Sequence, residues 1–365
     1  MRIGMILRRR PPISFRNYRD NMLRELTALS TEIVAFYEDE QTPASIDILW
    51  APEVGLELPP PVQHTRLPIV CTVHGGRIFY LPYREQVTSL VGAWRLHKVR
   101  KRIRSEWRMH SNAISAVIVP SAFSAKLFID VFAWPPETVH AIHHGVDCHK
   151  FFPIATPDRA CRIRPYFLHV SQHRDGKNIA RILAAYRRLP ALARPDLVLK
   201  VTGHPGPVPR QPGVVLLREE TPIAQLADLY RGAVALVFPS LYESFGMPIL
   251  EAMACGVPVI TSNSTGCREV AGGACEIVNA HSVGEIAAAM SRVAVDHTWR
   301  SELIRKGLTR ARSVPWIESA SRHLNVFRCV AAGKSISTGS ATPQNGDLLN
   351  KCAGLKPDSS GPYRS

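Results

Sequence analysis

Short apolar runs alternate with longer segments of helical periodicity along most of the chain, and this alternation constrains the fold more than any other feature. The runs are four to six residues long and rich in β-branched side chains, which favour strands. They predict strands at 2–7, 46–49, 69–72, 116–119, 139–142, 166–170, 197–202, 214–217, 233–238 and 258–261.

Strands followed in turn by helices, such as those expected at 179–188, 223–231 and 249–254, are typical of βα units. The fold class predicted is therefore α/β, with parallel sheets covered by helices on both faces. With 365 residues, 45% of them hydrophobic, the chain is long enough for two domains.

A segment rich in turn residues, prolines and charges separates two groups of strands, and it divides the chain at about residue 155. We expect a first domain over 1–155 and a second over 156–330. The remainder, 331–365, is rich in Gly, Ser and Pro, and this composition predicts a disordered tail.

The formal net charge of +15 favours an anionic partner, such as a nucleotide diphosphate, an anionic membrane surface or a nucleic acid. No apolar stretch reaches the roughly eighteen residues that a membrane span needs. The eight cysteines form neither a CxxC pair nor a Cys/His cluster at zinc-like spacing. We therefore expect no structural metal and no disulfide framework, and a reducing cytoplasm as the compartment.

The decapeptide YESFGMPILE, residues 242–251, follows a predicted strand directly. Ligands bind at the carboxyl ends of strands in doubly wound sheets, so Glu243 and the amides of Phe245 and Gly246 are expected on the ligand-facing rim. Glu251 follows in the first turns of a helix. Carboxylates accept hydrogen bonds from sugar hydroxyls, and free helix amides bind phosphate oxygens. Alternatively, both glutamates only add charge near a helix start.

Two further loops carry candidate binding residues. In FLHVSQHRDGKN, Lys177 stands at the end of a strand-to-helix loop, directly before the predicted helix. A lysine there is unfavourable for the helix dipole, whose N-terminal end is positive, but it is well placed to neutralise a phosphate. The alternative is an exposed loop lysine. In VHGG, His74 and the glycines follow a strand, so the backbone can approach a ligand closely. A lone histidine is more often structural than catalytic.

The segment FPSLYESFGMPILEAMACGVPVITS closely resembles the E-x7-E segment of the retaining family 4 glycosyltransferases (glycosyl transferases group 1), which have the GT-B fold. Other pieces follow in the order of that family: VHGG, IVPSAFSAKLF, IHHGVDCHKFFP, FLHVSQHRDGKN, LKVTGHPG, STGCREVAGGA and a helix around Trp316. The match spans about 66–320. It implies two Rossmann-like domains whose sheets face a cleft, the first on the acceptor side and the second binding a nucleotide sugar, with the last helix able to pack back on the first domain.

The resemblance also implies roles for residues of the second domain. Glu251 resembles the glutamate that binds the ribose hydroxyls, and Glu243 the catalytic glutamate near the transferred sugar. The amides of Phe245 and Gly246 would hold sugar hydroxyls. Lys177 matches the basic residue on the diphosphate.

In the first domain, His74 resembles the histidine that reaches the donor sugar and is the second catalytic candidate, and Gly75 would let the acceptor come close. The chain departs from the family in three places. Gln172 stands where the family often has an arginine on the phosphates, for which Arg174 is the candidate substitute. Ser244 replaces a glycine, and RRRPPISFRNYRD replaces a Gly-rich loop that normally approaches the diphosphate.

The sequence thus predicts an enzyme that moves a hexose, with mannose as one candidate, from a nucleotide-diphospho-sugar to a glycan or lipid-linked acceptor in polysaccharide biosynthesis. The resemblance implies a retaining reaction with no metal and no cofactor. One alternative is a non-catalytic sugar-nucleotide binder, which the altered loop and Gln172 leave open. The other is a basic nucleic-acid-binding protein, although no RRM, zinc-finger or helix-turn-helix signature is present.

A basic helix is predicted at 94–110, where Leu96, Val99, Ile103 and Trp107 form one apolar stripe among seven Arg and Lys residues. Such a helix can lie on an anionic membrane, which would place the protein on the inner face of the plasma membrane. Alternatively, the stripe packs on its own domain and the basic face is solvated.

Overall fold

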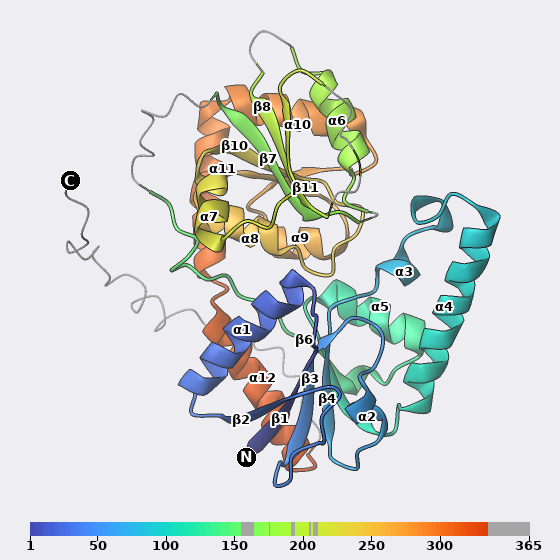
Figure 1. The fold of residues 1–365 in the computed structure, drawn as a ribbon. Coiled ribbons are helices and arrows are strands. Elements are labelled where there is room, and N and C mark those ends of the chain that lie inside the picture. The colour runs from blue at the N-terminus through green and yellow to red at the C-terminus, as the bar shows by residue number, and fades with distance from the viewer. Residues whose placement is uncertain (155–163, 175, 191–193, 204–205, 207–210, 335–365) are drawn as a thin grey trace.

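The computed structural model describes residues 1–154, 164–174, 176–190, 194–203, 206 and 211–334. The chain forms two α/β domains, each built on a six-stranded sheet with helices on both faces (Figure 1). Every strand pair within these sheets is parallel. This arrangement confirms the predicted fold class. The tail predicted from residue 331 lies outside the described residues from 335 onward.

The first sheet has the strand order β2-β1-β3-β4-β5-β6. Its inner strands β3 and β4 are buried along their whole length, because helices cover both faces. The strands are β1 (Arg2–Leu7), β2 (Glu32–Tyr37), β3 (Ile48–Val54), β4 (Ile69–Val73), β5 (Ile114–Val119) and β6 (Val139–Ala141). The helices are α1 (Ile13–Ala28), α2 (Pro60–Gln63), α3 (Arg77–Tyr80), α4 (Leu90–Met109) and α5 (Ala122–Phe132).

The second sheet has the order β12-β11-β10-β7-β8-β9. Its strands are β7 (Tyr166–Gln172), β8 (Asp196–Thr202), β9 (Val214–Leu217), β10 (Ala233–Phe238), β11 (Val259–Ser262) and β12 (Glu276–Val278). Its helices are α6 (Ile179–Arg187), α7 (Ile223–Arg231), α8 (Met247–Ala254), α9 (Thr265–Ala271), α10 (Val283–Val295) and α11 (His297–Arg312). The chain leaves β7 toward β9 and returns to β10 on the other side of β7, so the strand order reverses there. Such a switch point is where open α/β sheets bind ligands.

The last helix, α12 (Trp316–Ala331), leaves the second domain and packs beside α1 of the first (Figure 1). Trp316 and Phe327 on α12 belong to one apolar cluster with Trp50 of β3. Burying a side chain of this size stabilises the fold by about 1.5–3 kcal/mol. Within this interface the Tyr18 hydroxyl donates to Nε2 of His323 at 2.8 Å. The crossing helix therefore ties the second domain to the first.

A carboxylate of the second domain makes another connection between the domains. Glu269 on α9 accepts hydrogen bonds from the backbone amides of Ala122 and Phe123 at the start of α5, at 2.9 and 3.2 Å. His143 donates to the same carboxylate at 2.6 Å. Burial alone would raise the pKa of Glu269, but these hydrogen bonds outweigh it and lower the pKa. The charged carboxylate thus caps a helix of the other domain.

Candidate functional site

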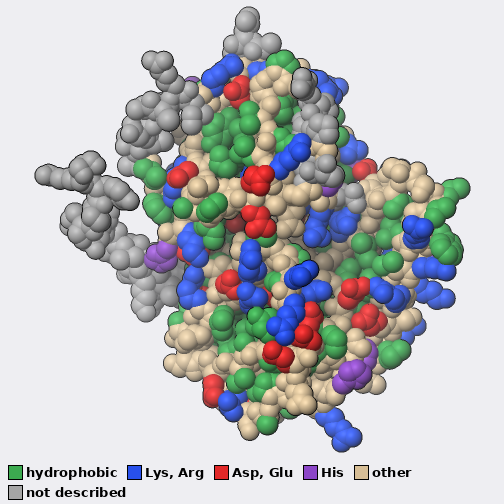
Figure 2. Space-filling view, in the orientation of Figure 1, with side chains coloured by type: hydrophobic (Ala, Val, Ile, Leu, Met, Phe, Trp, Pro, Cys, Tyr) green, Lys and Arg blue, Asp and Glu red, His purple; other side chains and the backbone are tan. Residues whose placement is uncertain are grey.

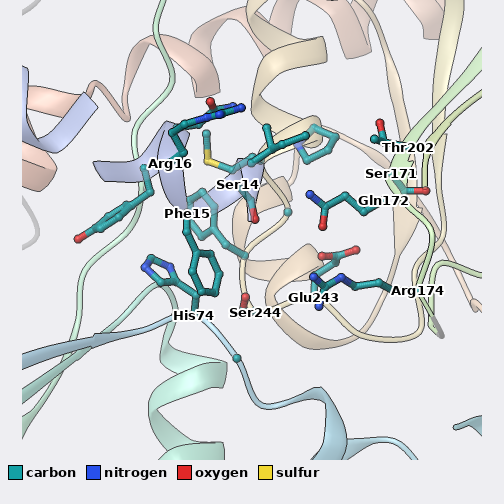
Figure 3. Close-up of a pocket in the computed structure, with 18 of the residues that line it drawn as sticks. Ser14, Phe15, Arg16, His74, Ser171, Gln172, Arg174, Thr202, Glu243 and Ser244 are labelled. Atoms are coloured by element: carbon teal, nitrogen blue, oxygen red, sulfur yellow. The ribbon is translucent and has the colours of Figure 1, made fainter. Parts of the chain in front are cut away.

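A cavity of about 970 Å³ lies between the two domains. Lys and Arg side chains gather along this boundary on the molecular surface (Figure 2). All nine residues that the sequence analysis singled out line the cavity: His74, Gly75, Gln172, Arg174, Lys177, Glu243, Phe245, Gly246 and Glu251. In Figure 3, Gln172, Arg174 and Glu243 extend into it from the second domain and face Phe15 and His74 of the first. The fold therefore brings together residues that are far apart in sequence.

An ion pair joins two of the predicted site residues. The Lys177 ammonium lies 2.5 Å from Oε1 of Glu243, and both side chains are largely buried. Lys177 ends the loop after β7, and Glu243 lies in the loop after β10, the neighbouring strand. In this ion pair the predicted phosphate cation and the predicted catalytic carboxylate neutralise one another. A diphosphate that binds Lys177 therefore competes with Glu243.

The loop that carries Glu243 is held by the first domain. The hydroxyls of Ser121 and Ser124, at the start of α5, donate to the backbone oxygen of Ser244 at 2.6 and 3.1 Å. Because these contacts use only the backbone, they accommodate a serine where the family has glycine. Gly246 directly precedes α8 as its N-cap and has a φ of 106°, a backbone conformation that glycine adopts readily. The loop geometry thus places the first amides of α8 at the cavity.

Glu251 lies on α8 with only 9% of its surface exposed. Its Oε2 accepts a hydrogen bond of 2.7 Å from the hydroxyl of Tyr230, which is fully buried on α7. Burial raises the pKa of Glu251 to about 7, and the hydrogen bond from Tyr230 only partly offsets this. Near neutral pH the carboxyl is therefore close to the point where its charged and neutral forms are equally populated. Donors from a ligand would favour the charged form.

His74 is neutral at physiological pH. Burial lowers the pKa of its imidazole to about 4, although the hydrogen bond between Nε2 and the backbone oxygen of Pro52, at 2.7 Å, opposes the shift. The ring packs against Phe15 and Tyr18, with centroid distances of 4.7 and 4.5 Å. Nε2 donates to the Pro52 oxygen, so Nδ1 is left as an acceptor.

Gly75 follows His74 at a close approach of two backbone segments. A Cβ added at Gly75 would lie 2.6 Å from the backbone oxygen of Gly55, so only glycine fits without movement. Gln172 ends β7 and is paired in register with Thr202 on β8. The glutamine brings no charge to the cavity, so Arg174 and Lys177 are the predicted phosphate cations that line it.

The sequence analysis missed several residues of the cavity. The arginine-rich segment does not form a Gly-rich loop: it leads into α1, and Arg8, Ser14 and Arg16 line the cavity. The positive charge of the two arginines was the only signal in the sequence. Lys200 on β8, which also lines the cavity, was missed because it lies within a predicted strand and no local motif marks it. Tyr230 on α7, the buried partner of Glu251, was missed for the same reason, since it lies within a predicted helix.

In the part of the chain that the structure describes, no group of three or more His, Cys, Asp or Glu side chains is arranged to hold a metal ion. None of the described helices is both long and apolar enough to cross a membrane.

Two α/β domains, each with a sheet of parallel strands and with a cleft between them, define the GT-B class of two-domain folds. The model of the family "Glycosyl transferases group 1" matches residues 162–310, and that of "Glycosyltransferase Family 4" matches residues 7–150. Together the two matches cover both domains. The chain belongs to the group 1 glycosyltransferases of the GT-B type, and the resemblance seen in its motifs is confirmed.

Individual proteins agree with this assignment. The O-antigen chain mannosyltransferase B of Escherichia coli is 28% identical over 283 residues, which covers 70% of this chain and 74% of that protein. The fold is similar to sucrose-phosphate synthase from Thermosynechococcus elongatus, with a TM-score of 0.72 and 17% identity over 92% of this chain and all of that one. It is also similar to HepE from Anabaena in complex with UDP-glucose, with a TM-score of 0.69 and 13% identity over 91% of this chain and 100% of that one.

Proposed function

We propose that this glycosyltransferase moves a hexose from a nucleotide-diphospho-sugar to a glycan or lipid-linked acceptor, with retention of configuration and without a metal ion. Mannose is the first sugar to test, because the O-antigen chain relative is named a mannosyltransferase, and the same relative favours polysaccharide biosynthesis. The observation that carries the proposal is the gathering of Glu243, Lys177 and Glu251 in one interdomain cavity.

In this proposal the donor takes one orientation in the cavity. Its diphosphate binds Lys177 and Arg174, whose charges balance it, together with the free amides at the start of α8. The ribose hydroxyls donate to Glu251. The hexose lies between Glu243 and His74, where both domains contact it.

The reaction breaks the bond between the anomeric carbon and the diphosphate oxygen, and the electron pair leaves with the diphosphate. The acceptor oxygen bonds to the anomeric carbon on the face that the diphosphate leaves, and the acceptor's proton passes to a phosphate oxygen. Negative charge therefore grows on the leaving group. Lys177 stabilises that charge, and losing one preorganised donor of this kind lowers the rate by ~10²–10³.

A donor screen tests the proposal. The enzyme is incubated with UDP-, GDP- and ADP-hexoses, release of the nucleoside diphosphate is measured, and NMR gives the anomeric configuration of the product. Glu243→Ala is expected to abolish transfer while the fold stays intact, and Glu137→Ala, at an exposed position, is the matched control. Wild-type turnover in Glu243→Ala would refute the assignment. An inverted product would refute retention.

Two other results would identify a different function. Donor binding without hydrolysis or transfer to any acceptor would favour a non-catalytic sugar-nucleotide binder. Stabilisation by no nucleotide sugar, together with salt-sensitive binding of RNA, would favour a nucleic-acid-binding protein.

We also propose that α4 contacts an anionic membrane. The sequence predicted one apolar stripe along this helix, but its two halves differ. Of the predicted stripe, Ile103 and Trp107 are buried in the first domain, whereas Leu96 is partly exposed and Val99 is 38% exposed. Leu90 and Trp94, which the predicted stripe did not include, are 90% and 56% exposed. Because only the second half of the helix packs on the domain, its first half projects from the edge (Figure 1).

At that edge the exposed apolar side chains border Lys and Arg side chains (Figure 2). Lys98 lies over the Trp94 ring, 3.7 Å from its centroid. Apolar side chains beside cations suit the interface of an anionic bilayer. We expect the protein to float with vesicles that contain anionic lipid and not with neutral vesicles. Leu90→Ser with Trp94→Ser should abolish flotation, while Met109→Ser, an exposed residue at the other end of α4, should not. Unchanged flotation of the double variant would contradict the proposal.

A further inference from the structure

A buried lysine on the cavity wall is not used by the function proposed above. Lys200 lies on β8 with 3% of its surface exposed, and it lines the same cavity. The strand order is β10-β7-β8, so Lys200 and the Glu243 loop lie on opposite sides of β7. With strands about 4.8 Å apart, β8 and β10 are separated by about 10 Å. Lys200 therefore belongs to a different end of the cavity from the catalytic candidate.

The ammonium of Lys200 has one hydrogen left for a ligand. Nζ donates to Oγ1 of Thr202 at 3.0 Å and to the backbone oxygen of Glu219. Those are its two hydrogen-bond acceptors within the described ranges, and an ammonium carries three hydrogens. These two bonds fix the side chain against β8 and the loop before α7. The third N–H of the ammonium therefore keeps one position, set by the protein itself.

The surroundings of Lys200 suit a flat, neutral ring better than a phosphate. Val170 is paired in register with Lys200 on the neighbouring strand, and Ile223 and Leu226 of α7 line the same cavity. Glu220 lines it as well, and its carboxylate, which lies 4.0 Å from the Arg16 guanidinium, also partly balances the charge of Lys200. Burial lowers the pKa of Lys200, while the nearby glutamates oppose that shift. The lysine thus offers a desolvated hydrogen-bond donor whose charge is already partly balanced.

We propose that Lys200 reads the nucleobase of the donor by donating a hydrogen bond to a ring carbonyl oxygen. This inference rests on the proposed function, since it takes a nucleotide as the ligand. Uracil O4 and guanine O6 are acceptors at positions where cytosine and adenine carry amino groups. An ammonium cannot accept a hydrogen bond, so a base with an amino group there leaves the third hydrogen of Lys200 without an acceptor. The enzyme is therefore selective for donors with an oxo base.

Two matched pairs of nucleotides test the assignment, because UDP and CDP differ at ring position 4 and IDP and ADP differ at ring position 6. Dissociation constants are measured by calorimetry for these four and for pyrophosphate. We expect the wild type to bind the oxo member of at least one pair about tenfold or more tightly than the amino member. Lys200→Met should weaken binding of that oxo nucleotide by about tenfold to a hundredfold and remove the preference, leaving pyrophosphate unchanged.

Lys200→Gln provides a second variant that keeps a donor and adds an acceptor, so it should bind amino bases better than the wild type does. It decides the question if Lys200→Met does not fold. Lys126→Met, an exposed lysine on α5, should retain the wild-type preference. An unchanged preference in both Lys200 variants, or an equal loss for all ligands including pyrophosphate, would overturn the base-reading role and leave the proposed function standing. Failure of the wild type to bind any nucleotide would overturn both.

Discussion

Replacing the buried carboxylate Glu251 by glutamine should make the protein more stable at high pH. The unfolded chain ionises this group near its ordinary pKa of 4.5, whereas burial raises the folded value to about 7. Between these values the folded state binds more protons, so its stability falls as the pH rises, and the loss is complete above pH 7. The difference of about 2.5 in pKa corresponds to about 3 kcal/mol.

Glu251→Gln removes the ionisation but keeps an oxygen that can accept from Tyr230. Relative to the wild type, we expect no change in the free energy of unfolding near pH 4.5 and a gain of about 3 kcal/mol near pH 8. For a domain of this size the gain corresponds to a melting temperature higher by about 6–12 °C. The same variant should bind nucleotide sugars more weakly, because a charged acceptor for the ribose is lost.

Urea unfolding at low and high pH measures the effect, with Glu137→Gln on the exposed surface as the matched control. The free energy of unfolding of the control variant should differ from that of the wild type by the same small amount at both pH values. If the difference between Glu251→Gln and the wild type does not depend on pH, or if the variant is the less stable of the two at high pH, the carboxyl is not buried as the structure places it.

Three further predictions follow from the same contacts. Lys177→Met should lower the free energy of unfolding by about 1–3 kcal/mol by isolating the Glu243 carboxylate, and adding Glu243→Gln should restore stability but not turnover; equal stability of the single and double variants would contradict this. Glu269→Ala should speed hydrogen exchange of the first amides of α5, with a smaller effect from Glu269→Gln, and protection equal to the wild type would show that the carboxylate does not join the domains. Nucleotide binding near pH 7 should release a proton from Glu251, seen as a binding enthalpy that depends on the buffer in the wild type and not in Glu251→Gln.

The sequence predicts the inner strands of both sheets well because they are buried on both faces and read as unbroken apolar runs. The two strands it misses, β2 and β12, each lie at one edge of a sheet, and both are partly exposed. β3 also extends beyond its predicted end through Pro52 and Glu53. A buried glutamate in a strand is stable here because Arg19 contacts its carboxylate at 3.0 Å. That partner is 34 residues away, so no local pattern reveals it.

The candidate site was predictable where a motif carries it and unpredictable where partners meet through the fold. All nine residues found from the motifs line the cavity, and their individual roles stay predictions. The pair of Lys177 and Glu243 joins residues 66 positions apart, in the loops that follow two neighbouring strands, so only the sheet order brings them together. Tyr230 looks like any apolar helix residue in the sequence. Its hydroxyl matters only because α7 packs beside α8 and aims it at Glu251.

The two carboxylates of the segment 242–251 stand in different electrostatic settings, and this difference favours a ligand that engages both. The charge of Glu243 is balanced by Lys177, whereas Glu251 has, among the described residues, only the phenol of Tyr230 as a side-chain donor. A diphosphate alone weakens the Lys177 pair and leaves the Glu243 carboxylate without a donor. A ribose alone supplies donors to Glu251 but leaves Lys177 paired with Glu243. A nucleotide sugar supplies an anion for the lysine and hydroxyl donors for both carboxylates, so its parts should bind non-additively. Recognition of the complete donor then follows from how the charges of the site are arranged.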